Sequence, residues 1–153
     1  MIKKETGDIL IPVSNFRIHI GLHEQELKDS LFYKELLREE RDMQTGYIWY
    51  DFFPIAFYSY KIIYSLCFKN SVLDCLHFCV DSDALPKSWA NWSKESELKR
   101  KHLNEKLLYE IFNDNINEQS TLPSAYHFEW GNIISCYDPR SGQSSIILHY
   151  NNN

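Results

Sequence analysis

The stretch from Phe57 to Val80 constrains the fold of this 153-residue chain more than any other part of the sequence. Two runs rich in β-branched and aromatic residues, FYSYKIIYSLCF (57–68) and VLDCLHFCV (72–80), flank the short polar segment Lys69-Asn70-Ser71. Asn tolerates the left-handed backbone conformation that tight hairpin turns require. The pattern therefore predicts a β-hairpin, and strands joined by a short turn must pair antiparallel.

Alternating or β-rich residues predict further strands on both sides of this hairpin. They cover residues 15–22, 45–53 and, around a turn at 138–142, the two halves of 126–150. Pro139 presets that turn and Gly142 supplies a positive φ. Hairpins need antiparallel pairing, and the predicted helices are too few to separate the strands as βαβ units do.

Two segments have helical spacing of their apolar residues. In residues 93–114, Ser93 is a plausible N-cap, and the apolar stripe consists of Leu103, Leu107, Leu108, Ile111 and Phe112. In residues 23–42 the stripe is clear only in the first half, so residues 33–41 are either helical or extended. A polar loop is predicted over residues 113–125.

The order of these elements is β-α-β-β-β-α-β-β, which predicts an α+β fold. We expect an antiparallel meander sheet of about five to six strands, with two main helices packed on one face. No repeat or linker divides the chain, so residues 1–153 are expected to form a single domain.

Composition excludes some classes of function. With 21 acidic and 16 basic residues the net charge is −5, which disfavours a nucleic-acid binder and is compatible with a basic protein partner. Aromatic residues make up 15% of the chain, which argues against disorder. The start, MIKKETGD, does not resemble a signal peptide, and the longest apolar stretch (52–63) contains Pro, Ser and Lys. We expect a cytoplasmic protein that does not contact a membrane.

The segment LDCLHFCVD (73–81) raises the question of a metal or thiol centre. On a regular strand, Leu73, Cys75, His77 and Cys79 share one face, but Cys75 and Cys79 are then roughly 13 Å apart and cannot bind one ion. Cys75 with His77, joined by Cys67, leaves a Cys/His-dependent or metal-dependent hydrolase as an alternative. Because free cysteine is usually a small buried hydrophobe, we expect no catalytic residue, no metal and no cofactor.

The loop DSDALPKSWANWS (81–93) contains the residues best suited to protein binding. Asp81 and Asp83 lack the further oxygen ligands of a calcium loop. Trp89 and Trp92 either pack in the core beneath the following helix, which we favour, or are exposed anchors of an interface. A third reading of the chain is an adaptor that holds a small molecule in an aromatic pocket near Trp49, Tyr58 and Tyr60.

The last strands carry a family resemblance. The segment FEWGNIISCYDPRSGQSSIILHY (128–150) combines an aromatic-Trp-Gly start, alternating apolar residues, Tyr-Asp, a Ser-Gly turn and a final strand ending in Tyr150. It resembles the closing hairpin of small bacterial immunity proteins encoded beside polymorphic toxins, including contact-dependent growth inhibition systems.

The resemblance implies a cytoplasmic, non-enzymatic antitoxin that binds and neutralises one cognate toxin domain, often a basic nuclease. Toxin-binding residues vary in such families, so candidates come from residue chemistry instead. They are Asp81, Asp83, Trp89 and Trp92 in the central loop, and Tyr137, Asp138 and Arg140 at the last turn.

Overall fold

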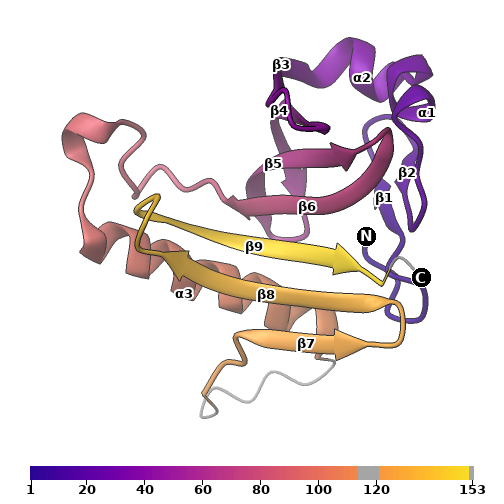
Figure 1. The fold of residues 1–153 in the computed structure, drawn as a ribbon. Coiled ribbons are helices and arrows are strands. Elements are labelled where there is room, and N and C mark those ends of the chain that lie inside the picture. Colours follow the sequence, from indigo (N-terminus) through magenta and orange to yellow (C-terminus); the bar gives the residue numbers. More distant parts are fainter. Residues whose placement is uncertain (114–120, 152–153) are drawn as a thin grey trace.

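Seven strands form one antiparallel sheet in the order β3-β4-β5-β6-β9-β8-β7, and two short strands form a separate hairpin, β1-β2. The computed structural model describes residues 1–113 and 121–151 (Figure 1). The strands are β1 (Ile9–Ile11), β2 (Phe16–Ile18), β3 (Leu37–Asp42), β4 (Tyr47–Phe57), β5 (Tyr60–Lys69), β6 (Val72–Val80), β7 (Ala125–Phe128), β8 (Gly131–Asp138) and β9 (Gln143–Tyr150). The helices are α1 (Glu24–Asp29), α2 (Leu31–Leu36) and α3 (Lys94–Phe112), with a short 3₁₀ turn, η1 (Trp89–Asn91).

The predicted α+β class and antiparallel sheet are confirmed. The strand order differs from that of a simple meander at one place. Strands β3 to β6 follow one another as neighbours, but β6 next pairs with β9 rather than with β7. The chain leaves β6, runs along α3, enters the far edge at β7 and returns strand by strand to the centre (Figure 1). Of the predicted loop 113–125, residues 114–120 lie outside the described residues.

The central hairpin forms as predicted, with a turn of two residues. Lys69 pairs with Val72, and Asn70 and Ser71 both have positive φ, 49° and 68°. The preceding turn was not predicted. Strand β4 continues past Pro54 to Phe57, because Pro54 lies at the register shift between Phe52 and Ile55, a position that tolerates proline. The chain then reverses at Tyr58 and Ser59.

The predicted helix over 23–42 is three elements. Ser30 ends α1 and caps α2, its hydroxyl accepting a hydrogen bond from the Tyr33 backbone N–H at 3.1 Å. Residues 37–42 are the edge strand β3, so the extended alternative holds for that part of the segment. Without an apolar stripe the segment has nothing to bury as a helix, whereas as a strand it pairs with β4.

One face of the sheet carries the hydrophobic core. Leu66, Leu76 and Leu148 occupy one row across neighbouring strands, and all three are buried. Helix α3 covers this face over β6, β8 and β9, and Figure 1 shows it behind the strands. Phe32 of α2 stacks on Phe52 and on Phe16 of β2, so the short helices and the β1-β2 hairpin cover the same face farther along. No helix among the described residues is long and apolar enough to span a membrane.

Polar side chains of α3 form hydrogen bonds with the backbone at the ends of two strands. The fully buried Asn104 accepts a hydrogen bond from the Val80 N–H at 2.9 Å, and Arg100 donates to the Val80 carbonyl at 2.8 Å. Glu97 accepts from the Ser144 N–H at 2.8 Å, at the start of β9. These bonds satisfy backbone groups at the ends of β6 and β9 that the sheet does not pair.

Replacing Asn104 should therefore destabilise the protein. In Asn104→Ala the Val80 N–H loses its acceptor inside the protein, which costs about 1–3 kcal/mol together with the lost packing. Urea unfolding at neutral pH measures this loss. The matched control is Lys106→Ala, an exposed residue on the same helix that should leave the unfolding free energy nearly unchanged. Equal stability of the two variants would contradict the role given to Asn104.

Candidate functional site

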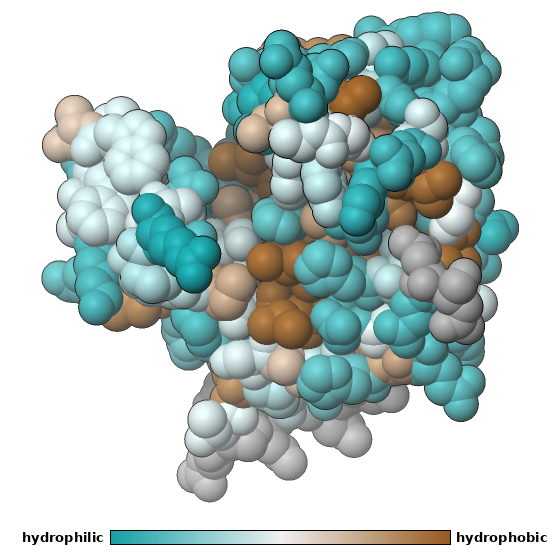
Figure 2. Space-filling model, viewed as in Figure 1, coloured by the Kyte–Doolittle hydropathy of each residue, from teal (hydrophilic) through white to brown (hydrophobic). Residues whose placement is uncertain are grey.

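The two groups of candidate residues, in segments 81–92 and 137–140, are far apart in the sequence but come together at one end of the sheet. Figure 1 shows the 81–93 segment beside the β8–β9 turn. The Trp92 indole N–H donates to the Gly142 carbonyl at 2.7 Å, which joins the two segments. We call residues 81–93 together with residues 138–142 the tryptophan lobe. It projects from the body of the protein in Figure 2.

Two features of position 142 favour glycine. Its φ is +66°, a left-handed conformation that residues with a Cβ rarely adopt. A Cβ at this position would also lie 3.2 Å from the Trp92 ring. The sequence indicated the turn and the positive φ, but it gave no sign of the indole packed against it.

Both tryptophans are exposed, so the favoured interpretation of them as core residues is wrong. Trp89 is 67% exposed and Trp92 is 39% exposed, with ring centroids 6.3 Å apart. The core beneath α3 is already filled by residues of the helix and sheet, chiefly Leu107, Leu108, Ile133, Ile146 and Leu148. The short 3₁₀ turn η1 instead turns the indoles outward. Large exposed aromatic side chains held in place are typical of interface anchors.

The aspartates of the lobe have different surroundings. Asp81 is nearly buried and pairs with Lys61 at 3.5 Å and with Lys87. Burial opposes its ionisation, but the two lysines outweigh this and hold the pKa of Asp81 below its ordinary value. Asp83 is fully exposed and lies 3.3 Å from Lys87. Asp81 therefore supports the base of the lobe, while Asp83 is exposed at its surface.

The residues of the last turn lie next to the 81–93 segment, since Gly142 of this turn contacts Trp92. Asp138 accepts a hydrogen bond from the Arg140 N–H at 2.9 Å, which shapes the turn, and both side chains are exposed. Tyr137 is half-buried, with the Lys94 ammonium 5.9 Å from its ring centroid. Arg100 donates to the Pro86 carbonyl at 3.4 Å as well as to Val80, so α3 also fixes the position of the 81–93 segment.

The second face of the sheet is open and carries a buried charge that the sequence did not single out. Asp51 of β4 accepts two hydrogen bonds from Arg41, at 2.8 and 3.0 Å, and one from Ser65 at 2.5 Å. Burial opposes ionisation of this carboxyl, but these bonds hold the pKa of Asp51 below its ordinary value. The Arg41–Asp51 ion pair joins the edge strand β3 to β4, where Arg41 lies opposite Trp49.

Because of the Arg41–Asp51 ion pair, we expect the free energy of unfolding to fall in acid. Because the pKa of Asp51 is lower in the folded state, its contribution is present above the unfolded value of about 3.9 and is lost as the pH falls through the folded value. Urea unfolding of the protein and of Asp51→Asn should differ by about 1–3 kcal/mol at pH 7, and the difference should shrink below pH 4. A difference independent of pH would contradict the assignment.

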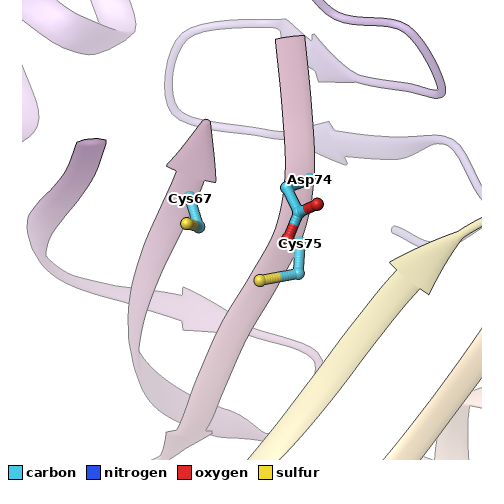
Figure 3. A group of neighbouring side chains, drawn as sticks. All are labelled: Cys67, Asp74 and Cys75. Atoms are coloured by element: carbon cyan, nitrogen blue, oxygen red, sulfur yellow. The ribbon is translucent and has the colours of Figure 1, made fainter. Parts of the chain in front are cut away.

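The cysteine segment is arranged differently from the prediction. Leu73 points into the core instead of sharing a face with Cys75, because β6 has a register shift next to Asp74. The possible ligand group among the described residues is Cys67, Asp74 and Cys75 (Figure 3), and His77 is not in it. His77 instead packs edge-on against Trp49, with ring centroids 4.8 Å apart.

The thiols are poor nucleophiles in this setting. Burial raises the pKa of Cys67 to about 11, and burial together with the neighbouring Cys67 raises that of Cys75 further. Burial also lowers the pKa of His77, so this imidazole is neutral near pH 7. A hydrolase needs a thiolate with a base beside it, and this arrangement disfavours both.

The aromatic residues proposed for a small-molecule pocket do not converge. Trp49 pairs with Cys67 near the start of β4, whereas Tyr58 and Tyr60 lie at the turn beyond its other end. The cavity beneath the sheet is apolar, lined by residues such as Ile9, Ile18 and Phe78, and has a volume of about 10 Å³. That is room for about one water molecule.

Two further residues of the C-terminal segment are structural. The Trp130 indole N–H donates to the Lys4 carbonyl at 2.7 Å, and the Tyr150 hydroxyl donates to the Gly7 carbonyl at 2.9 Å. Both therefore hold the N-terminal segment against the last strands. The motif that carries the family resemblance thus has a role in the fold itself.

Comparison with known proteins finds a likeness of fold. No protein-family model matches the sequence, and no curated protein matches it. A chain in the solved structure of Rhs1-CT in complex with its cognate immunity protein RhsI1 is similar, with a TM-score of 0.56 and 13% identity. The match covers 98% of this chain and 86% of that chain. The resemblance noted in residues 128–150 agrees with this shared fold.

Proposed function

We propose that this protein is an immunity protein that binds and neutralises the C-terminal domain of a cognate bacterial toxin. The observation that carries the proposal is the fold, which extends over nearly the whole chain and is shared with a chain of a toxin–immunity complex. We extend the proposal to a non-enzymatic inhibitor that acts in the cytoplasm of the producing cell as one domain, residues 1–153. Contact-dependent growth inhibition systems are one setting for such a protein.

The proposed toxin-binding surface is the tryptophan lobe. Trp89 offers a large apolar contact area, and Trp92 is held by its hydrogen bond to Gly142, so little side-chain freedom is lost on binding. Asp83, Asp138 and Arg140 add exposed charges to the same lobe. An aromatic centre with a polar rim is the usual composition of a protein interface.

We further propose that the toxin domain is basic, as nucleases often are. The net charge of −5 favours encounter with a positively charged partner. The same charge disfavours a direct contact of this protein with nucleic acid. Binding would then block the active site of the toxin or the access of its substrate.

The first test is protection from the toxin encoded immediately upstream of this protein. Expression of the toxin domain alone should stop growth, and co-expression of this protein should restore it through a stable 1:1 complex. The two purified proteins should co-elute in size-exclusion chromatography. If no toxin-like domain is encoded there, or if co-expression with that domain restores no growth, the proposed function is wrong.

Substitution of Trp89 tests the surface separately. We expect Trp89→Ala to raise the Kd for the toxin domain about 30-fold, since truncation of an interface anchor costs about 2 kcal/mol or more. Leu31→Ala is the matched control: Leu31 is 63% exposed, and Figure 1 places α2 far from the lobe. Isothermal titration calorimetry measures both. Equal affinities would exclude the lobe as the interface while leaving the protective function in place.

The salt dependence of association tests whether the toxin domain is basic. The association rate constant with the toxin domain should fall as salt is raised from 50 to 500 mM, because screening shortens the range of attraction. The dissociation rate should change much less. Stopped-flow measurements at several salt concentrations distinguish this from an association rate independent of salt, which would contradict a basic partner.

A further inference from the structure

We infer that Cys67, Asp74 and Cys75 form a binding site for a thiophilic divalent cation of the Zn²⁺ class on the open face of the sheet. Their ligand atoms, two sulfurs and a carboxylate oxygen, all lie within 4.8 Å of one another. Figure 3 shows the three side chains side by side on β5 and β6. This site is independent of the proposed function.

The β-bulge in β6 creates the group. Cys67 pairs with Cys75 and Phe68 pairs with Leu73, which leaves Asp74 as the extra residue between them. In a regular strand Asp74 would share a face with Leu76, Phe78 and Val80, all buried in the core. The bulge gives that core position to Leu73 and turns Asp74 beside Cys75. Three ligands from adjacent strands therefore meet without any rearrangement of the backbone.

The distances suit a small ion. Two ligands about 2.3 Å from a tetrahedral Zn²⁺ are about 3.8 Å apart, so ligand atoms within 4.8 Å of one another need to close by at most about 1 Å. Side-chain rotation can supply this. Two thiolates and a carboxylate fill three tetrahedral positions, and the fourth is available to water or to a donor of a partner, as in open zinc sites.

Arg41 offsets part of the charge of the loaded site, although it also pairs with Asp51. Two thiolates and one carboxylate around a divalent ion carry a net charge of −1. Arg41, whose positive charge acts on Cys67, lies over the Trp49 ring on the neighbouring strand with its guanidinium 5.8 Å from the centroid. Cys67 and Cys75 are 1% and 4% exposed, so the two thiolate ligands would be shielded from solvent.

The expectation that this segment binds no metal assumed a regular strand. On such a strand Cys75 and His77 share a face and Cys67 can join them from the partner strand, whereas Asp74 points to the other face. The sequence does contain a sign of the bulge. Leu73 and Leu76 are three residues apart, which breaks the alternation that Leu76, Phe78 and Val80 follow.

Cobalt is a suitable probe, because Co²⁺ bound by thiolates has an intense charge-transfer absorption in the near ultraviolet. The full chain, reduced and freed of metal by a chelator, should bind one equivalent of Co²⁺ with this absorption, and Zn²⁺ should abolish it by displacement. Cys75→Ser should lose the absorption, and Asp74→Asn should weaken Co²⁺ binding at least about tenfold. Binding should also weaken as the pH falls, since each thiol must release its proton.

Cys79→Ser is the matched control, because Cys79 is a free cysteine on the same strand and outside the group. It should bind Co²⁺ with unchanged absorption and affinity. Circular dichroism establishes that each variant is folded; if Cys75→Ser does not fold, the half-buried Asp74→Asn decides the question by its affinity. Absence of the charge-transfer absorption in the unaltered protein, or its persistence with unchanged affinity in Cys75→Ser or Asp74→Asn, would overturn the site.

Discussion

The pairing of β6 with β9 is the interaction on which the rest of the structure depends. It joins the hairpins of the first half, β3 to β6, to those of the second half, β7 to β9, through register pairs from Cys75–His149 to Phe78–Ile146. Helix α3 stabilises this junction through Asn104 and Arg100 at the end of β6 and through Glu97 at the start of β9. The core face and the tryptophan lobe are both built around it.

The two faces of the sheet have different roles. The covered face holds the apolar core, and the cavity within it has a volume of about 10 Å³. The open face carries the Arg41–Asp51 pair and the cysteine group, and Figure 2 shows hydrophobic residues gathered on it over β8 and β9. Chemistry-bearing residues thus lie on the face that neither helices nor the N-terminal hairpin cover, and at the lobe beside it.

The sequence was most informative where local rules decide the outcome. Asn70 and Ser71 form the turn that the hairpin prediction required, and helix α3 begins after Ser93 as expected. Prediction failed where the structure of a segment depends on a contact with residues far away in the sequence. Residues 37–42 became a strand because β4 offered a partner, and Trp89 and Trp92 are exposed because other residues fill the core beneath α3. A local sequence pattern does not show whether a tryptophan fills the core or is exposed because other residues already fill it.

The sequence by itself determined the α+β class, the antiparallel pairing, the candidate loop and turn, and the family resemblance in residues 128–150. These follow from periodicity, turn chemistry and residue types, which act over a few positions. Only the tertiary structure decided that Trp92 contacts Gly142 and that a bulge places Asp74 beside Cys67 and Cys75. Those contacts depend on strand register and on pairing between segments far apart in the chain, and register is fixed by the packing of the whole core.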